Sequence, residues 1–314
     1  MFKPPFSQFN RHAQTILPSL FRKIELKTIR EKIFMPDGDF LLVDWAKTGS
    51  KKCVIVTHGL EGDSKRHYVV GILKKFITNG FDGLAWNCRS CGGEMNLLPK
   101  FYHHGDASDL KFVIDYALQT NNYDEIILVG FSMGGSLTLR VLSENADTFP
   151  PSVKCAAVAS VPLDLTTSVA KLEKKGNRFY MNRFLRKLRK KIEIKEAMFP
   201  NHAILTLKNF KNIKDFNGFD STFTAPLHGY KDAADFYLRA SVKPILHKIK
   251  VPVLIMQAKN DPFLTPECLE LGDAEKNKNL NLLVTSKGGH VGFQQANSIE
   301  TFFEKMAFDF YSKI

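Results

Sequence analysis

The sequence predicts a doubly wound α/β fold with a mostly parallel sheet. Short apolar runs that end near Gly or Asn recur along the chain, and amphipathic helical patterns lie between them. These runs are apolar on both faces, as in parallel strands that helices cover on both sides. The 314 residues, 44% hydrophobic and 24% charged, suit one large folded domain and exclude a disordered, collagenous or coiled-coil protein.

The expected elements follow in chain order. Residues 24–45, with a turn at Pro36-Asp37-Gly38, predict an antiparallel hairpin at the start of the sheet. Six further strands are expected at residues 53–56, 83–86, 125–129, 155–161, 252–256 and 280–284. Before the third of these, Leu110, Val113, Ile114 and Ala117 recur at helical spacing and predict an amphipathic helix.

The alternation of strands and helices stops between Leu163 and Lys250. This stretch has no comparable strand pattern, and charged residues, Asn and Phe dominate it. We therefore expect an α/β core made of residues 1–162 and 248–314, with an inserted helical cap, or lid, at residues 163–247.

The formal net charge of +12 is concentrated in the expected cap. Residues 171–195 hold eleven Lys or Arg against two Glu, and the apolar side chains between them recur at helical spacing: Met181, Phe184, Leu185, Leu188 and Ile192. We expect a basic amphipathic helix whose apolar stripe covers an active-site mouth and whose charges lie in solvent. Peripheral contact with an anionic membrane is the alternative use of this charge. No nucleic-acid partner is expected, because no motif for base or phosphate recognition accompanies the charge.

The cysteines and the first residues suggest a cytoplasmic protein. Five irregularly spaced cysteines do not form a disulfide framework, and no apolar run approaches a membrane span or a signal-peptide core. Cys88 and Cys91 form a Cys-x-x-Cys pair, but without a second pair they are expected to be ordinary thiols.

Gly-Phe-Ser-Met-Gly at residues 130–134 predicts a nucleophile. It follows an expected strand and precedes a helical pattern. A sharp strand-to-helix turn projects the serine hydroxyl, and the flanking glycines allow the strained backbone and close packing that such a turn needs. Ser132 is therefore the candidate nucleophile.

A serine nucleophile needs a base, and the base needs an orienting acid. Asp261 and His290 each follow an expected strand, so with Ser132 they are expected at the carboxyl edge of the sheet, in the chain order Ser, Asp, His. Asp164 is the alternative acid, but its position at the start of the cap suits a helix N-cap.

His-Gly-Leu-Glu-Gly at residues 58–62 predicts the oxyanion loop. Acyl transfer needs two N–H groups aimed at the developing oxyanion, which we assign to Leu60 and Met133. His58 is expected to brace this loop. No metal or organic cofactor is needed, although a metallohydrolase that uses His58, His103 and His104 is an alternative.

Several stretches carry a resemblance to a known family: residues 10–16, 58–62, 87–94, 102–106, 130–134 and 223–230. Through them the chain resembles the YheT-like branch of the α/β-hydrolase fold family, relatives of the mammalian abhydrolase-domain carboxylesterases. The resemblance implies an α/β-hydrolase fold and a catalytic triad at Ser132, Asp261 and His290. The family usually has glycine where Ser90 stands. Spacing assigns no chemical role to Tyr102, His103 or His228, which we expect to brace the pocket.

The expected activity is that of a carboxylesterase-type serine hydrolase acting on a small-molecule or lipid-like ester. Two alternatives stay open. One is a lipase-like or phospholipase-like enzyme at an anionic membrane surface, and the other is a non-catalytic α/β-hydrolase fold that only binds ligands.

Overall fold

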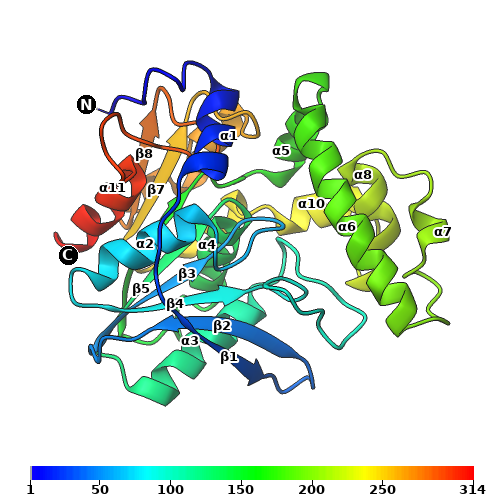
Figure 1. Cartoon of the computed structure of the whole chain (residues 1–314), viewed down its shortest axis with the longest axis horizontal. Helices are drawn as coiled ribbons and strands as arrows, with labels where there is room; N and C mark the ends of the chain where they lie inside the picture. The colour runs from blue at the N-terminus through cyan, green and yellow to red at the C-terminus, as the bar shows by residue number, and fades with distance from the viewer. Residues whose placement is uncertain (1) are drawn as a thin grey trace.

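The computed structural model describes residues 2–314 and contains an eight-stranded sheet (Figure 1). The strand order is β1-β2-β4-β3-β5-β6-β7-β8. The strands are β1 (Ile29–Phe34), β2 (Phe40–Ala46), β3 (Lys52–Thr57), β4 (Asp82–Asn87), β5 (Glu125–Phe131), β6 (Val153–Ala159), β7 (Val253–Ala258) and β8 (Leu280–Thr285). Only the β1–β2 and β2–β4 pairings are antiparallel, which confirms the predicted mostly parallel sheet.

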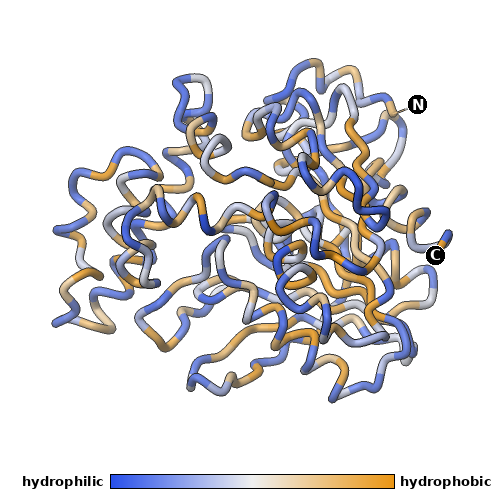
Figure 2. Tube along the Cα trace, turned by 180° about the vertical axis from the view of Figure 1, so that it is seen from behind, coloured by the Kyte–Doolittle hydropathy of each residue, from blue (hydrophilic) through white to orange (hydrophobic). Residues whose placement is uncertain are grey.

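The strands are apolar on both faces because helices cover both faces. In β3, Cys53 and Ile55 pack in one cluster with residues of α3 (Ser108–Asn121) and α4 (Met133–Glu144). Val54 and Val56 point the other way, into a cluster with α2 (His67–Ile77) and α11 (Phe302–Tyr311). Figure 2 shows the strands mostly in hydrophobic colours, whereas the helices alternate.

Between β6 and β7 the described residues form helices and no strand. The α-helices are α5 (Leu165–Leu172), α6 (Arg178–Met198), α7 (Leu207–Phe210), α8 (Phe216–Phe219), α9 (Ala225–Leu227) and α10 (Ala233–Ala240). The other helical segments are the 3-10 helices η1 (Lys175–Asn177) and η3 (Lys243–Lys248) and the π-helix η2 (Asp220–Thr224). Most of them lie together to one side of the sheet (Figure 1). Over residues 2–314, no helix is long and apolar enough to cross a bilayer.

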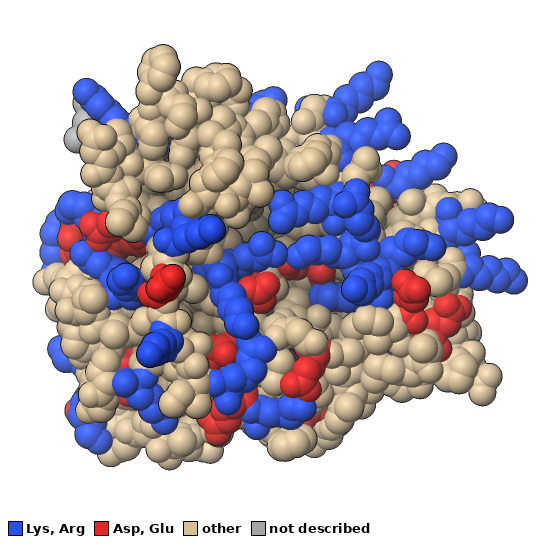
Figure 3. Space-filling model, viewed as in Figure 1, with Lys and Arg blue, Asp and Glu red and all other residues tan. Residues whose placement is uncertain are grey.

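Helix α6 agrees with the predicted apolar stripe but not with the predicted solvation of its charges. Met181, Leu185, Leu188 and Ile192 are buried, as expected. The expectation that all the charges lie in solvent is wrong, because a row of lysines on one side of the helix contacts loops of the core. The other basic side chains of α6 are exposed, and Figure 3 shows a band of Lys and Arg across this face of the molecule.

Candidate active site

Ser132 lies on the sharp turn between β5 and α4. Its φ of 53° and ψ of −121° are unusual for a residue with a side chain, and they point the hydroxyl out of the turn. A Cβ on Gly130 would lie 2.5 Å from the Gly134 carbonyl oxygen, and one on Gly134 would collide with the Thr57 and His58 carbonyl oxygens. Both glycines of the motif are therefore required by packing.

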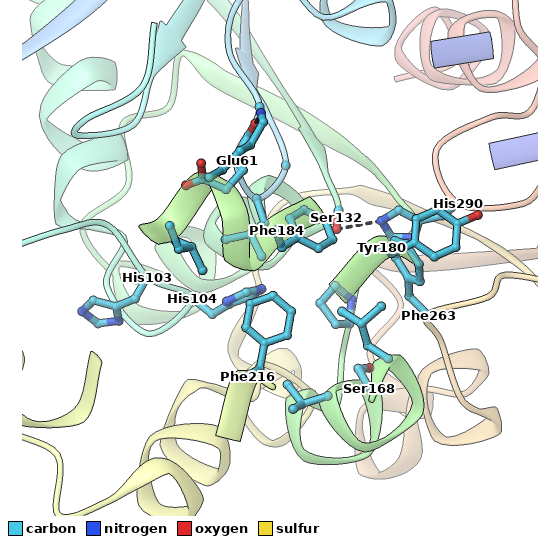
Figure 4. A pocket seen from close by; sticks show the side chains of 18 of the residues that line it. Glu61, His103, His104, Ser132, Ser168, Tyr180, Phe184, Phe216, Phe263 and His290 are labelled. Atoms are coloured by element: carbon cyan, nitrogen blue, oxygen red, sulfur yellow. Dashed lines mark hydrogen bonds between the residues drawn. The ribbon is translucent and has the colours of Figure 1, made fainter. Parts of the chain in front are cut away.

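The loops after β7 and β8 carry Asp261 and His290, and Figure 4 shows the contact between His290 and Ser132. His290 Nε2 lies 2.9 Å from Ser132 Oγ, and His290 Nδ1 lies 2.8 Å from Asp261 Oδ2. The Asp261 carboxylate is buried, and its other oxygen accepts from the Phe263 N–H at 2.7 Å. This arrangement can pass a proton from the serine hydroxyl to the imidazole while the carboxylate fixes the ring.

Asp164, the alternative acid, lies at the start of α5. Its side chain accepts from the Thr167 N–H at 3.0 Å and caps the helix, as its sequence position suggested. Among the described residues, the only carboxylate that contacts His290 is that of Asp261.

The loop of residues 58–62 runs close to Ser132. A Cβ on Gly59 would lie 3.2 Å from Ser132 Cβ. Within residues 2–314, neither the Leu60 N–H nor the Met133 N–H donates a hydrogen bond, and Met133 begins helix α4, where the helix dipole is positive. Both N–H groups are thus free to bind an oxyanion next to the serine.

His58 connects this loop to the end of β4. Its Nδ1 lies 2.7 Å from the Gly59 carbonyl oxygen, and its Nε2 accepts from the Cys88 N–H at 3.1 Å. Both ring nitrogens are occupied by backbone groups, which leaves none for a metal ion. Elsewhere in the described chain, no group of three His, Cys, Asp or Glu side chains is arranged to hold one.

Helix α1 (Arg11–Phe21), which we did not predict, holds the loop that carries His290. Gln14 Oε1 accepts from the Gly288 N–H at 2.8 Å and from Asn260 Nδ2 at 2.9 Å. Thr15 Oγ1 accepts from the His290 N–H at 2.9 Å. Residues 10–16 stand out in the sequence only by resemblance, because no local pattern shows that these side chains meet a loop near residue 290.

A pocket of about 240 Å³ opens beside Ser132. Its apolar lining comes mainly from α5, α6, α8 and the loop after β7, and includes Val169, Leu172, Phe184, Phe216, Phe219 and Phe263. Phe184 and Phe216 project into it in Figure 4. Such a lining suits the hydrocarbon part of a ligand.

The same pocket has a polar side formed by histidines that burial keeps neutral. Burial lowers the pKa of His103 to about 3 and the pKa values of His104 and His228 to about 4. The His103 and His228 rings pack 4.2 Å apart, and His103 Nδ1 accepts from the Gly105 N–H at 3.1 Å. Tyr102, next in sequence, contacts the loop of residues 58–62. These contacts agree with the bracing roles we expected.

The stretch of residues 87–94 contains Ser90, which stands where the family usually has glycine, and two of the five cysteines. Ser90 has a φ of 62°, a value that favours glycine, and its hydroxyl bonds to Asn96. This explains why glycine is usual at this position and how a serine is accommodated. All five cysteines, including Cys88 and Cys91, are buried free thiols.

Comparisons with known proteins agree with this architecture. The family model for the alpha/beta hydrolase fold matches residues 52–296. "Putative esterase YheT" of Escherichia coli (strain K12) is 31% identical over 90% of this chain and 84% of its own length. "Phospholipase ABHD3" of Homo sapiens is 28% identical over 89% of this chain and 70% of its own length.

Solved structures show the same fold. The Pyrococcus furiosus esterase Pf2001 superimposes with a TM-score of 0.62 at 21% identity, over 91% of this chain and 92% of that one. The matched family model and the 31% identical relative establish the family. The chain belongs to the α/β-hydrolase fold family, in its YheT-like branch.

Proposed function

We propose that the protein is a carboxylesterase-type serine hydrolase that forms an acyl-enzyme on Ser132. The observation that carries this proposal is the contact of Ser132 Oγ with His290 Nε2 at 2.9 Å beside an apolar pocket. The names of the relatives, an esterase and a phospholipase, support an ester bond as the target.

The proposed mechanism has two half-reactions. Ser132 Oγ attacks the ester carbonyl carbon while His290 accepts its proton, and the oxyanion binds the Leu60 and Met133 N–H groups. His290 then protonates the departing alcohol, which leaves the acyl group on Ser132. Water, deprotonated by His290, releases the acid and restores the serine. Asp261 holds the imidazole ring in place through both steps.

The substrate is a lipid-like or small hydrophobic ester. The apolar side of the pocket suits the acyl chain, and the neutral histidines offer hydrogen bonds to polar groups of the ligand without charge. In this proposal residues 163–247 serve as the cap, because α5, α6 and α8 supply much of the lining. The cytoplasmic location expected from the sequence belongs to the same proposal.

The test is the reactivity of Ser132. A fluorophosphonate probe should label the wild-type protein at Ser132, and Ser132→Ala should lose labelling and reduce kcat on p-nitrophenyl butyrate by about 10⁵- to 10⁶-fold. The melting temperature of Ser132→Ala should stay near that of the wild type. Wild-type protein that neither labels nor hydrolyses any ester would instead support the non-catalytic alternative.

A lipase-like action at an anionic membrane is the second candidate, and the surface around the pocket mouth favours it. Ile16 and Ser19 of α1 and Arg183 of α6 line the pocket, so these two helices flank it. Near them Phe21 and Phe179 are 73% and 62% exposed. Exposed apolar side chains on these helices, together with the exposed basic side chains of α6, suit an anionic bilayer.

Vesicle sedimentation tests this second candidate. Vesicles with about 30% phosphatidylserine carry a negative surface potential. Binding to them should exceed binding to vesicles of phosphatidylcholine alone. It should weaken in the double variant Arg186→Gln with Lys190→Gln. Equal binding to both kinds of vesicle would contradict an electrostatic membrane contact, whatever the activity on soluble esters.

A further inference from the structure

Three lysines of α6 face the core rather than the solvent. Lys187, Lys191 and Lys195, which we call the lysine row, stand one helical turn apart and share one side of the helix. Lys195 is fully buried, and its Nζ donates to the Asn96 carbonyl oxygen at 2.6 Å. Lys187 and Lys191 both contact Glu61, in the loop that follows β3. The lysine row therefore joins α6 to two loops of the core.

Glu61 is held through its backbone and through its side chain. Its N–H donates to the Tyr102 hydroxyl at 2.8 Å, and that hydroxyl donates to Glu61 Oε1 at 2.7 Å. Lys191 Nζ lies 2.6 Å from the same Oε1, in an ion pair whose two side chains are only 12% and 4% exposed. Lys187 Nζ donates to the Glu61 carbonyl oxygen at 2.7 Å. The N–H, the carbonyl oxygen and the carboxylate of Glu61 are thus all held by neighbouring side chains.

The backbone of Glu61 needs this support. The Gly62 N–H donates to the Gly59 carbonyl oxygen at 2.9 Å and closes a turn in which Leu60 and Glu61 are the central residues. Glu61 has a φ of 54°, a conformation that costs free energy for any residue except glycine. Contacts with its side chain must offset that cost, since the turn alone would favour glycine there.

We propose that Lys187 and Lys191, acting through Glu61, are positioning residues that hold the Leu60 N–H toward the ester oxyanion. The inference rests on the proposed function, because the Leu60 N–H has this role only in an ester hydrolase. Helix α6 then has two tasks. Its apolar stripe lines the pocket, and its lysine row keeps the oxyanion loop in shape. Ester cleavage is in this way coupled to the position of α6, since any movement of α6 away from the core breaks the contacts of Glu61.

The kinetic test compares Lys191→Gln and Glu61→Gln with two matched controls, Lys190→Gln and Arg186→Gln. The controls change exposed charges on the same helix. On p-nitrophenyl butyrate, Lys191→Gln and Glu61→Gln should lower kcat by about 10- to 100-fold and leave KM within about 3-fold, because the oxyanion forms only in the transition state. The controls should keep wild-type kcat and KM. Wild-type kcat in folded Lys191→Gln and Glu61→Gln would overturn the proposal.

A second variant covers the case in which these substitutions prevent folding. Glu61→Gly removes the carboxylate and leaves Lys191 without its partner, but glycine adopts the positive φ without strain, so this variant should fold and melt at a higher temperature than Glu61→Gln. We expect its kcat to fall as in Glu61→Gln. Full activity in folded Glu61→Gly would show that the side chain holds nothing that catalysis needs.

Amide hydrogen exchange separates this inference from the proposed function. The hydrogen-bonded amides of Glu61 and Gly62 should exchange at least about ten times faster in Lys191→Gln than in the wild type, and at the wild-type rate in Lys190→Gln. Unchanged exchange in Lys191→Gln would refute the holding role even in an active esterase. Faster exchange in a protein that neither labels at Ser132 nor hydrolyses esters would establish the holding role and overturn the proposed function.

Discussion

Ser132 has a backbone conformation that costs on the order of 1–3 kcal/mol for a residue with a side chain. Hydrogen bonds on both sides of the turn stabilise it: the Ser132 N–H donates to the Ala159 carbonyl oxygen at 2.9 Å, and the Ser136 N–H donates to the Ser132 carbonyl oxygen at 3.1 Å. The close fit of Gly134 against β3 leaves the turn no room to relax. At the scale of single residues, the reactive geometry is therefore maintained by β3, β6 and the first turn of α4.

Asp261→Asn should lower kcat by roughly 10³- to 10⁴-fold, because His290 loses the carboxylate that orients its ring. Steady-state kinetics on p-nitrophenyl butyrate measure this loss. Asp164→Asn is the matched control, since asparagine also caps helices and α5 should keep its start. A larger kinetic defect in Asp164→Asn than in Asp261→Asn would reverse the assignment of the acid.

At the scale of secondary structure, α6 has three sides with different surroundings. Its apolar side packs against α8, where the Phe184 and Phe216 ring centroids lie 5.8 Å apart, and both rings line the pocket. Its lysine row contacts the core, and the remaining basic residues face solvent. The position of α6, and with it the shape of the pocket, therefore depends on the contacts of its lysine row with the core.

Phe184→Ser should change the preference for acyl chain length. Removing the ring deletes part of the apolar wall, so kcat/KM on p-nitrophenyl octanoate should fall by about 10-fold while the value on p-nitrophenyl acetate changes little, in line with about 1.5–3 kcal/mol for a buried aromatic contact. The control is Phe179→Ser, which removes an exposed ring from the same helix. Equal losses on both esters would show that Phe184 does not contact the acyl chain.

At the scale of the whole molecule, the two ends of the chain complete the site together. The α1 side chains of Gln14 and Thr15 hold the loop of His290. Arg22, just after α1, forms a buried ion pair with Glu304 of α11 at 2.7 Å. Breaking a buried pair of this kind costs about 3–5 kcal/mol. The ion pair with α11 therefore helps to fix the end of α1, the helix that holds the loop of His290.

The whole molecule should lose stability as the pH falls from about 6.5 to about 4. Burial lowers the pKa values of His104 and His228 to about 4, so these groups bind protons near pH 6.5 only after unfolding. Their contribution to the free energy of unfolding is present above the unfolded pKa and is lost as the pH falls toward the folded pKa. The urea midpoint, followed by circular dichroism, should be lower at pH 5 than at pH 7.5.

Variants separate this effect from the opposing titration of Asp220. Burial raises the pKa of Asp220 from 3.8 to about 7, so its contribution to the free energy of unfolding is present at low pH and is lost as the pH rises from the unfolded pKa through the folded pKa. Asp220→Asn should therefore steepen the acid loss of stability, and His228→Gln should make it shallower. An unchanged midpoint between pH 7.5 and pH 5 in all three proteins would contradict the buried neutral histidines.

Much of the fold could be predicted from local patterns. All six strands expected after the hairpin lie within two residues of the observed strands, because apolar runs bounded by turn residues mark buried strands directly. The chain order and strand context of Ser132, Asp261 and His290 also predicted that these three residues meet, and the structure places them within hydrogen-bond distance. Their catalytic roles stay a proposal until the variants are measured.

The sequence by itself determined the elements, the apolar stripe of α6 and the side chains available at the sheet edge, because periodicity and turn chemistry are properties of neighbouring residues. Only the tertiary structure decided which polar groups meet. Lys191 reaches Glu61 across 130 residues, and Gln14 reaches Gly288 across 274. In the sequence such a lysine is indistinguishable from the exposed Lys190 beside it. A charge is buried or solvated according to what the other elements place opposite it, and that is set by packing rather than by local sequence.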